Sequence, residues 1–256
     1  MPTFRFLVIS AIPATALLFT ALTASATERK FAYSYEVTTA PKGSIEFENT
    51  VTWKHYRGEA RVDQFDFRHE FEFGVTDRLQ IGLYAADWSY TDSAAERGAT
   101  YDNSGVEVIY NLTNPTTDFL GSALYGEVLV GDRSVLVEGK LLLQKNFGAW
   151  TIAYNAVLEA AWEGEHLSQL NEHHGELAQT LGVSYQFTPH FLAGGEVLLE
   201  VDLPDWSKAE RSIVFAGPNA SIRFGRFFAT AAGLFRVTSN DGEPNVQTRL
   251  IVGFVF

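Results

Sequence analysis

The chain contains no cysteine. Disulfide cross-links, thiolate nucleophiles and cysteine-ligated metal sites are therefore excluded. Basic residues are also scarce, because 19 Lys and Arg stand against 31 Asp and Glu and give a net charge of -12. Nucleic-acid phosphates repel a chain of this charge, so we expect no nucleic-acid partner.

Long apolar runs are missing after the N-terminal segment, so the sequence predicts no transmembrane helix there. Residues 1–26 differ from the rest. Arg5 supplies a positive charge, 6–22 is apolar and uncharged, and 24–26 reads Ala-Ser-Ala. This pattern predicts a secretory signal peptide that is cleaved after Ala26, and an uncleaved membrane anchor is the alternative.

Aromatic residues are abundant, with 20 Phe, 10 Tyr and 5 Trp interspersed with charged residues. This composition favours short amphipathic strands over helices. From residue 44 onward, apolar and polar residues alternate with the period of a strand. The expected strands are 44–55, 63–75, 79–88, 104–112, 119–130, 134–145, 151–163, 175–187, 191–201, 212–224, 228–237 and 245–256.

The connections alternate between tight turns, such as 76–78 and 146–148, and mostly longer polar loops, such as 89–103. Tight turns at one end and long loops at the other are typical of outer-membrane barrels. The fold expected for 44–256 is therefore all-β, a single transmembrane antiparallel up-and-down β-barrel of about 12 strands. Residues 27–43 form a thirteenth strand, a periplasmic arm or an interior plug.

Each expected strand has one face whose middle positions carry no charge. A lipid-facing surface requires this, because a charge at the bilayer centre costs about 2 to 4 kcal/mol. The strand charges then fall inside, where carboxylates outnumber bases. In a soluble β-sandwich, the alternative, the uncharged face would be the core. The predicted pore-lining residues are Glu70, Glu72, Glu107, Glu127, Glu138, Lys140, Glu159, Glu196, Arg223 and Arg249.

Counting residues across the tight turns places Glu127, Glu138 and Glu159 side by side on three neighbouring strands, with Lys140 diagonal to them. Acidic rings attract cations, so this row predicts a cation-favouring constriction. A solvated or salt-bridged inner wall without selectivity is the alternative.

His69 is the polar exception on the lipid-facing side. The same counting places it opposite Asn49 and beside Ala85. An outer-membrane phospholipase resembles this pair in carrying His and Asn on its lipid-facing surface, but that chemistry also needs a Ser nucleophile, which is missing here. We therefore expect no catalytic residue and no enzyme activity. The pair predicts a polar contact in a possible homo-oligomer or a partly hydrated site.

A second pair of candidates, His173 and His174, is expected in a loop near Glu172 and Glu176. Histidines and carboxylates are ligands for metals such as Zn. Adjacent loop histidines usually bind nothing, so we expect no metal and no cofactor.

The C-terminal residues 250–256 alternate and end on Phe256. They resemble the last strand of Gram-negative outer-membrane barrels, which implies that Phe256 belongs to a signal read by the barrel-assembly machinery. The stretches 125–127 (Tyr-Gly-Glu), 138–141 (Glu-Gly-Lys-Leu) and 188–189 (Thr-Pro) resemble uncharacterised porin-like barrels distantly similar to phenol-degradation transporters. The resemblance implies a place in the bacterial outer membrane, surrounded by its lipid, and assigns no site.

The leading functional hypothesis is a passive channel for small molecules or cations through an acidic lumen. One alternative is a non-transporting structural or receptor-like barrel that acts through its extracellular loops and has a plugged lumen. Another is an outer-membrane lipid-active enzyme at Asn49 and His69.

Overall fold

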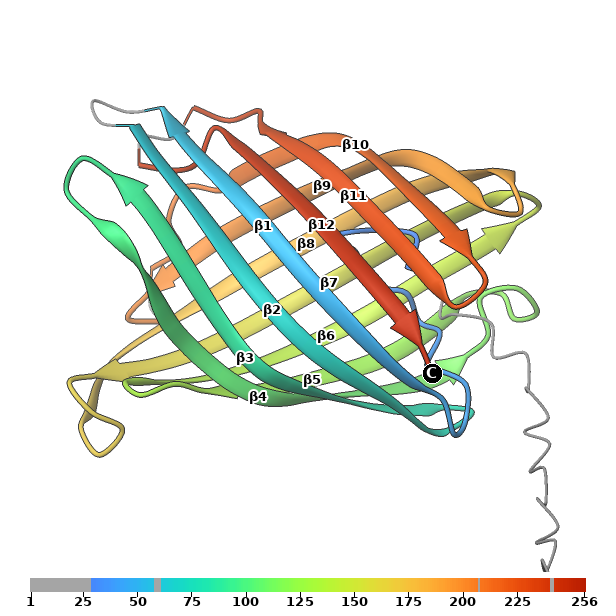
Figure 1. The fold of residues 1–256 in the computed structure, drawn as a ribbon, viewed down its shortest axis with the longest axis horizontal. Helices are drawn as coiled ribbons and strands as arrows, with labels where there is room; N and C mark the ends of the chain where they lie inside the picture. The colour runs from blue at the N-terminus through green and yellow to red at the C-terminus, as the bar shows by residue number, and fades with distance from the viewer. Residues whose placement is uncertain (1–28, 58–60, 207, 240–241) are drawn as a thin grey trace, which may run out of the picture.

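The computed structural model describes residues 29–57, 61–206, 208–239 and 242–256. Twelve antiparallel strands pair in chain order and close into a barrel where β12 meets β1 (Figure 1). This confirms the expected fold, whereas the predicted signal peptide, 1–26, lies outside the described residues. The strands are β1 (Ile45–Arg57), β2 (Arg61–Thr76), β3 (Leu79–Ser93), β4 (Arg97–Thr113), β5 (Gly121–Val130), β6 (Ser134–Phe147), β7 (Trp150–Gly164), β8 (Leu170–Thr188), β9 (Phe191–Pro204), β10 (Ile213–Phe224), β11 (Phe227–Arg236) and β12 (Val246–Val255).

The clearest departure from the expected boundaries is the hairpin of β3 and β4. Residues 89–103 were expected to form a loop, but pairing continues through them as far as Asp92 opposite Arg97. The side chains of these two residues form an ion pair at 2.9 Å near the tip. Water solvates both faces beyond the membrane, so a strand can continue there without an apolar outer face.

The two faces of the wall differ as expected. Leu124, Leu141 and Leu158 point outward and are 51%, 43% and 50% exposed, whereas the inward Glu107 and Glu196 are 1% and 2% exposed. Exposed leucines on neighbouring strands form a continuous apolar surface. Among the described residues, no helix is long and apolar enough to cross a membrane.

Replacing Leu141 by arginine tests the outer surface, because Leu141 is exposed near the middle of β6. We expect Leu141→Arg to lower the free energy of unfolding in lipid vesicles by about 2 to 4 kcal/mol, because a charge would enter hydrocarbon. Urea unfolding followed by tryptophan fluorescence measures the change. Leu141→Ala is the matched control and should cost clearly less. Equal losses would contradict a lipid-facing position.

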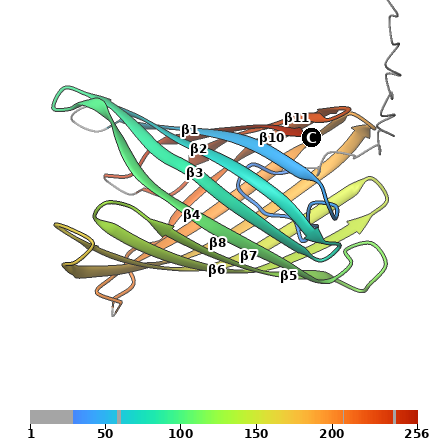
Figure 2. The same cartoon turned by 60° about the horizontal axis from the view of Figure 1, so that its bottom comes forward.

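Residues 29–43, which we call the inner segment, lie within the barrel at the end that carries the tight turns (Figures 1 and 2). Phe31, Val37 and Ala40 are fully buried. The segment ends in a turn at Gly43, whose φ of 82° favours glycine. The Gly43 N–H donates to the carbonyl of Gly74 at 2.7 Å, which fixes the turn to β2.

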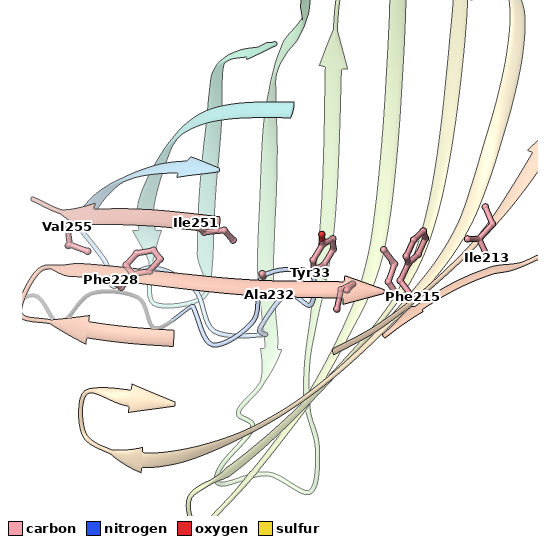
Figure 3. Packing of buried hydrophobic residues seen from close by; sticks show 10 residues of the cluster. Tyr33, Ile213, Phe215, Phe228, Ala232, Ile251 and Val255 are labelled. Carbon is pink, nitrogen blue, oxygen red and sulfur yellow. The ribbon is translucent and has the colours of Figure 1, made fainter. Parts of the chain in front are cut away.

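Two apolar patches of the inner wall hold the inner segment. Ala32 and Tyr33 belong to a buried cluster with residues of β9 to β12, among them Phe215 and Phe228 (Figure 3). Val37 packs in a second cluster, formed with Ile109, Ala123, Tyr125 and Leu142. The barrel interior therefore combines charged surface with apolar patches that the inner segment covers.

Candidate functional site: an acidic lumen and its inner segment

Side chains of the wall bind the backbone of the inner segment, and Glu196 makes the densest set of these contacts. Its carboxylate accepts the N–H groups of Ala32, Tyr33 and Ser34, each at 2.8 Å. Hydrogen bonds to a charged acceptor are stronger than neutral ones, and a buried N–H group needs a partner. Glu196 is thus the main polar anchor of the segment.

Amides on other strands continue this pattern. Asn155 accepts the N–H of Tyr35 at 2.7 Å and donates to its carbonyl at 3.0 Å. Gln144 accepts the N–H of Val37 at 2.9 Å, and Asn111 donates to the Val37 carbonyl at 2.7 Å. Amide side chains thus take the place that a neighbouring strand would have in a sheet.

Basic side chains of the lumen rest on tyrosines of the inner segment. The Arg249 guanidinium lies 4.1 Å from the centre of the Tyr33 ring, and the Lys140 ammonium lies 4.1 Å from that of Tyr35. Arg29, which belongs to the inner segment, places its guanidinium carbon 4.5 Å from the centre of the same Tyr35 ring. These cation–π contacts stabilise the seated segment.

A cavity of about 410 Å³ lies against the inner segment, with Tyr33 and Tyr35 among its lining residues. A second cavity, of about 220 Å³, is lined by Asp202 and by Glu243 from the β11–β12 loop. Glu176 and Glu200 line both cavities, so the two cavities adjoin each other. Outside the membrane-spanning strands, burial and then the nearby Asp202 raise the pKa of Glu243 above its ordinary value.

The carboxylates of the wall form one registered row across the strands. Each member lies opposite the next on the neighbouring strand, and Gly82 of β3 is the one interruption. The row runs through Glu46, Glu72, Gly82, Glu107, Glu127, Glu138, Glu159, Glu176 and Asp202. Because barrel strands are tilted, such a row climbs around the wall, here from the tight-turn end to the long-loop end.

Two bases form ion pairs with carboxylates in the middle of this row. Arg68 contacts Glu127 at 3.3 Å and also binds Asp87, and Lys140 contacts Glu138 at 2.8 Å. Within the described part of the chain, neither Glu159 nor Glu176 has a basic group within 4 Å. The side of the cavity formed by β7 and β8 therefore carries two carboxylates that have no direct ion pair among the described residues.

The expected placement of Glu127, Glu138 and Glu159 side by side is confirmed by the strand register. In the structure the row also includes Glu107, opposite Glu127, and Glu176, opposite Glu159, which were not predicted. Counting residues across the β4–β5 and β7–β8 connections could have indicated these two members. Irregular pairing between Asn111 and Thr113 obscures the count across the β4–β5 connection.

The other predicted pore-lining residues are spread along the barrel. Glu70 and Arg249 line the larger cavity, and Glu196 lies behind the inner segment. Glu72 and Glu107 are buried nearer the tight-turn end. Arg223 lies one residue before the end of β10, beside its tight turn. A role of the whole set in lining a pore stays a prediction.

On the outer face, His69 lies opposite Asn49 and its Nδ1 is 2.7 Å from the Asn49 Oδ1. The prediction that Ala85 is the neighbour of His69 is wrong, because the strand register shifts there and Ala86 lies opposite His69. This shift brings the Trp88 indole within reach, and its N–H donates to Nε2 of His69 at 3.1 Å. Nε2 is then an acceptor, so Nδ1 carries the proton and neither nitrogen is available as a base.

His173 and His174 lie within β8, not in a loop. They are opposite Trp162 and Ala161 respectively. Successive residues of a strand point to opposite faces, so the two rings cannot share one metal ion.

Phe256 closes the seam between the first and last strands. Its N–H donates to the carbonyl of Ile45 at 2.9 Å, and its ring lies 5.3 Å from that of Phe254 in an edge-to-face arrangement. Recognition of this residue during assembly stays a prediction.

A closed twelve-strand barrel with an apolar outer belt and a charged interior defines a porin-like β-barrel of the outer-membrane class. The chain belongs to a family of unknown function, DUF6662, whose model matches residues 23–249. No curated protein sequence matches it.

Solved structures share this fold. The COG4313 outer membrane channel from Pseudomonas putida F1 is similar at a TM-score of 0.65 and 12% identity, over 86% of this chain and 98% of that one. The translocator domain of the autotransporter NalP from Neisseria meningitidis gives 0.52 and 13%, over 83% and 88%. The NanC porin gives 0.51 and 10%, over 82% and 98%. At these identities the likeness concerns the fold.

Proposed function

We propose that the protein is a passive outer-membrane channel that favours small cations and is closed in this conformation by its inner segment. The long loops then face the cell exterior, the tight turns face the periplasm, and the signal peptide is removed after Ala26. Outer-membrane lipid surrounds the apolar belt, and the barrel-assembly machinery inserts the chain. The Asn49 and His69 pair is the place where a second copy would make a polar contact.

The carboxylate row is the observation that carries this proposal. It spans nine strands and includes Glu159 and Glu176, which have no basic group within 4 Å among the described residues. A lining in which carboxylates predominate concentrates cations and disfavours anions. Both cavities border this acidic side, and Glu176 and Glu200 line both of them.

The proposal excludes enzymatic activity at the outer face. Both ring nitrogens of His69 are engaged by Asn49 and Trp88, so His69 cannot remove a proton from a nucleophile. A second candidate function is a non-transporting barrel that acts through its extracellular loops. The burial of the inner segment favours that candidate, because it fills part of the lumen.

Reconstitution into planar bilayers under a KCl gradient tests the channel. We expect a reversal potential of the sign that K⁺ permeation produces, in the wild type or in a variant whose inner segment is loosened at Glu196. Anion selectivity would overturn the preference for cations. A folded protein that passes no current in either form would leave the loop-acting barrel as the function.

A further inference from the structure

A cluster of buried glutamates lies near the tight-turn end, apart from the large cavity's acidic side. It comprises Glu46 and Glu48 of β1, Glu70 and Glu72 of β2, and Glu107 of β4, each at most 3% exposed. Carboxylate oxygens of Glu70, Glu72 and Glu107 lie within 4.8 Å of one another, and so do those of Glu46, Glu48 and Glu72. Glu72 is common to both groups.

The partners of this cluster are few. Arg29 of the inner segment approaches Glu48, with Nε 3.5 Å from Oε1. The Tyr84 hydroxyl donates to Glu107 at 2.6 Å. Oε1 of Glu70 is buried and has no hydrogen-bond partner among the described residues, as is true of both carboxylate oxygens of Glu48. An unpartnered buried carboxylate oxygen directed into a ring of oxygens is what a ligand would satisfy.

Gly82 provides the space in which these groups converge. A Cβ atom at this position would lie 2.3 Å from Oε1 of Glu70 and 2.4 Å from Cγ of Glu107. Any larger residue would therefore push the two carboxylates apart. The row of carboxylates is interrupted at Gly82, and the interruption is filled by two acidic side chains from the flanking strands.

Burial makes this concentration of negative charge costly unless protons or a cation neutralise it. A hard divalent cation suits carboxylate oxygens, and Ca²⁺ binds six to eight oxygens at about 2.3 to 2.6 Å. Two oxygens on one such ion are at most about 5 Å apart, which is the spacing found here. The absence of nitrogen or sulfur ligands in the cluster favours Ca²⁺ over transition metals.

We propose that Glu70, Glu72 and Glu107 bind one divalent cation of the Ca²⁺ type, with Glu46 beside it and Glu48 paired to Arg29. The ion joins β2 to β4 across Gly82 of β3, next to the inner segment, whose Arg29 contacts Glu48. Binding therefore stabilises the barrel with the segment seated. This site shares Glu72 and Glu107 with the carboxylate row, but ion binding is measured without conduction, so the site holds whether or not the lumen conducts.

Calorimetric titration of CaCl2 into the chelator-treated full-length protein in detergent micelles tests the site, with thermal unfolding as a second readout. We expect one bound ion per chain and a higher Tm with Ca²⁺. Glu70→Gln should weaken binding about tenfold or more. Glu165→Gln is the matched control, because it removes an exposed carboxylate of the β7–β8 loop, and should bind as the wild type does.

Gly82→Ala provides a second variant that keeps every ligand and removes only the space between them. We expect it to weaken Ca²⁺ binding while circular dichroism still shows a folded barrel. Absence of binding in the wild type would mean that protons neutralise the cluster and would overturn the proposal. Equal affinities in Glu70→Gln and Glu165→Gln would also overturn it, because the ion would then bind elsewhere.

Discussion

Replacing Glu196 by alanine is expected to raise the conductance of the reconstituted barrel several-fold above that of the wild type. The substitution removes the acceptor of three N–H groups of the inner segment at once. Each buried donor left without a partner costs about 1 to 3 kcal/mol, so the seated segment loses most of its advantage over a released one. Single-channel recording measures the change directly.

Glu165→Ala is the control for this experiment, because it removes an exposed carboxylate in the β7–β8 loop. A second variant reaches the same end by a different route. A Cβ atom at Gly182 would lie 2.5 Å from the Phe31 ring, so Gly182→Leu should displace the inner segment while keeping Glu196, which lies opposite it on β9. If both variants fold and conduct no better than the wild type, the inner segment does not close the lumen.

Neutralising Glu159 and Glu176 together is expected to reduce the preference for K⁺ over Cl⁻ strongly. A unit charge about 4 Å from a passing ion contributes about 1 kcal/mol even in bulk-like water, which corresponds to about fivefold in local concentration. Glu159→Gln combined with Glu176→Gln preserves side-chain size and removes both charges. The reversal potential in a KCl gradient should move toward zero.

The selectivity measurement is best made in the Glu196→Ala background, where current is expected. Glu165→Gln is the matched control, since it changes the net charge outside the row. An unchanged reversal potential in the double variant would contradict the proposal that the row sets selectivity. In that case the carboxylates would be a solvated wall of the lumen.

Alternation was a sufficient guide to the strands because lipid imposes it. In 65–75, every second position except His69 is apolar, and this pattern predicted a strand that the structure contains within β2. Tight hairpins then fixed the local register, which is why Asn49 opposite His69 and Glu127 opposite Glu138 were predictable. Outside the membrane this constraint ends, and the paired residues of 89–103 were mistaken for a loop.

The irregular positions were not predictable from alternation. The extra residue at Ala85 shifts the pairing of β2 with β3 by one, and Trp88 reaches His69 only because of it. A bulge of this kind leaves no period of its own in a sequence. The contact between the indole and the imidazole was therefore missed.

The inner segment was also beyond the reach of the sequence. Phe31, Tyr33, Tyr35 and Val37 alternate as a strand would, but the closed barrel offers no free edge with which they could pair. Glu196 and the amides of Asn155 and Gln144 supply the missing partners from three different strands. Residues that converge from such distant positions share no local pattern.

The seam between β1 and β12 has a consequence for biogenesis. The first strand to be synthesised completes its pairing only when the last one arrives, and Phe256 bonds to Ile45 at that junction. The inner segment directly precedes β1, and its contacts extend from β3 to β12. Closure of the barrel is thus a late step that joins strands far apart in the sequence, and such non-local pairing is intrinsically slow. The nascent chain must therefore be kept from aggregating until β1 and β12 pair and enclose the inner segment.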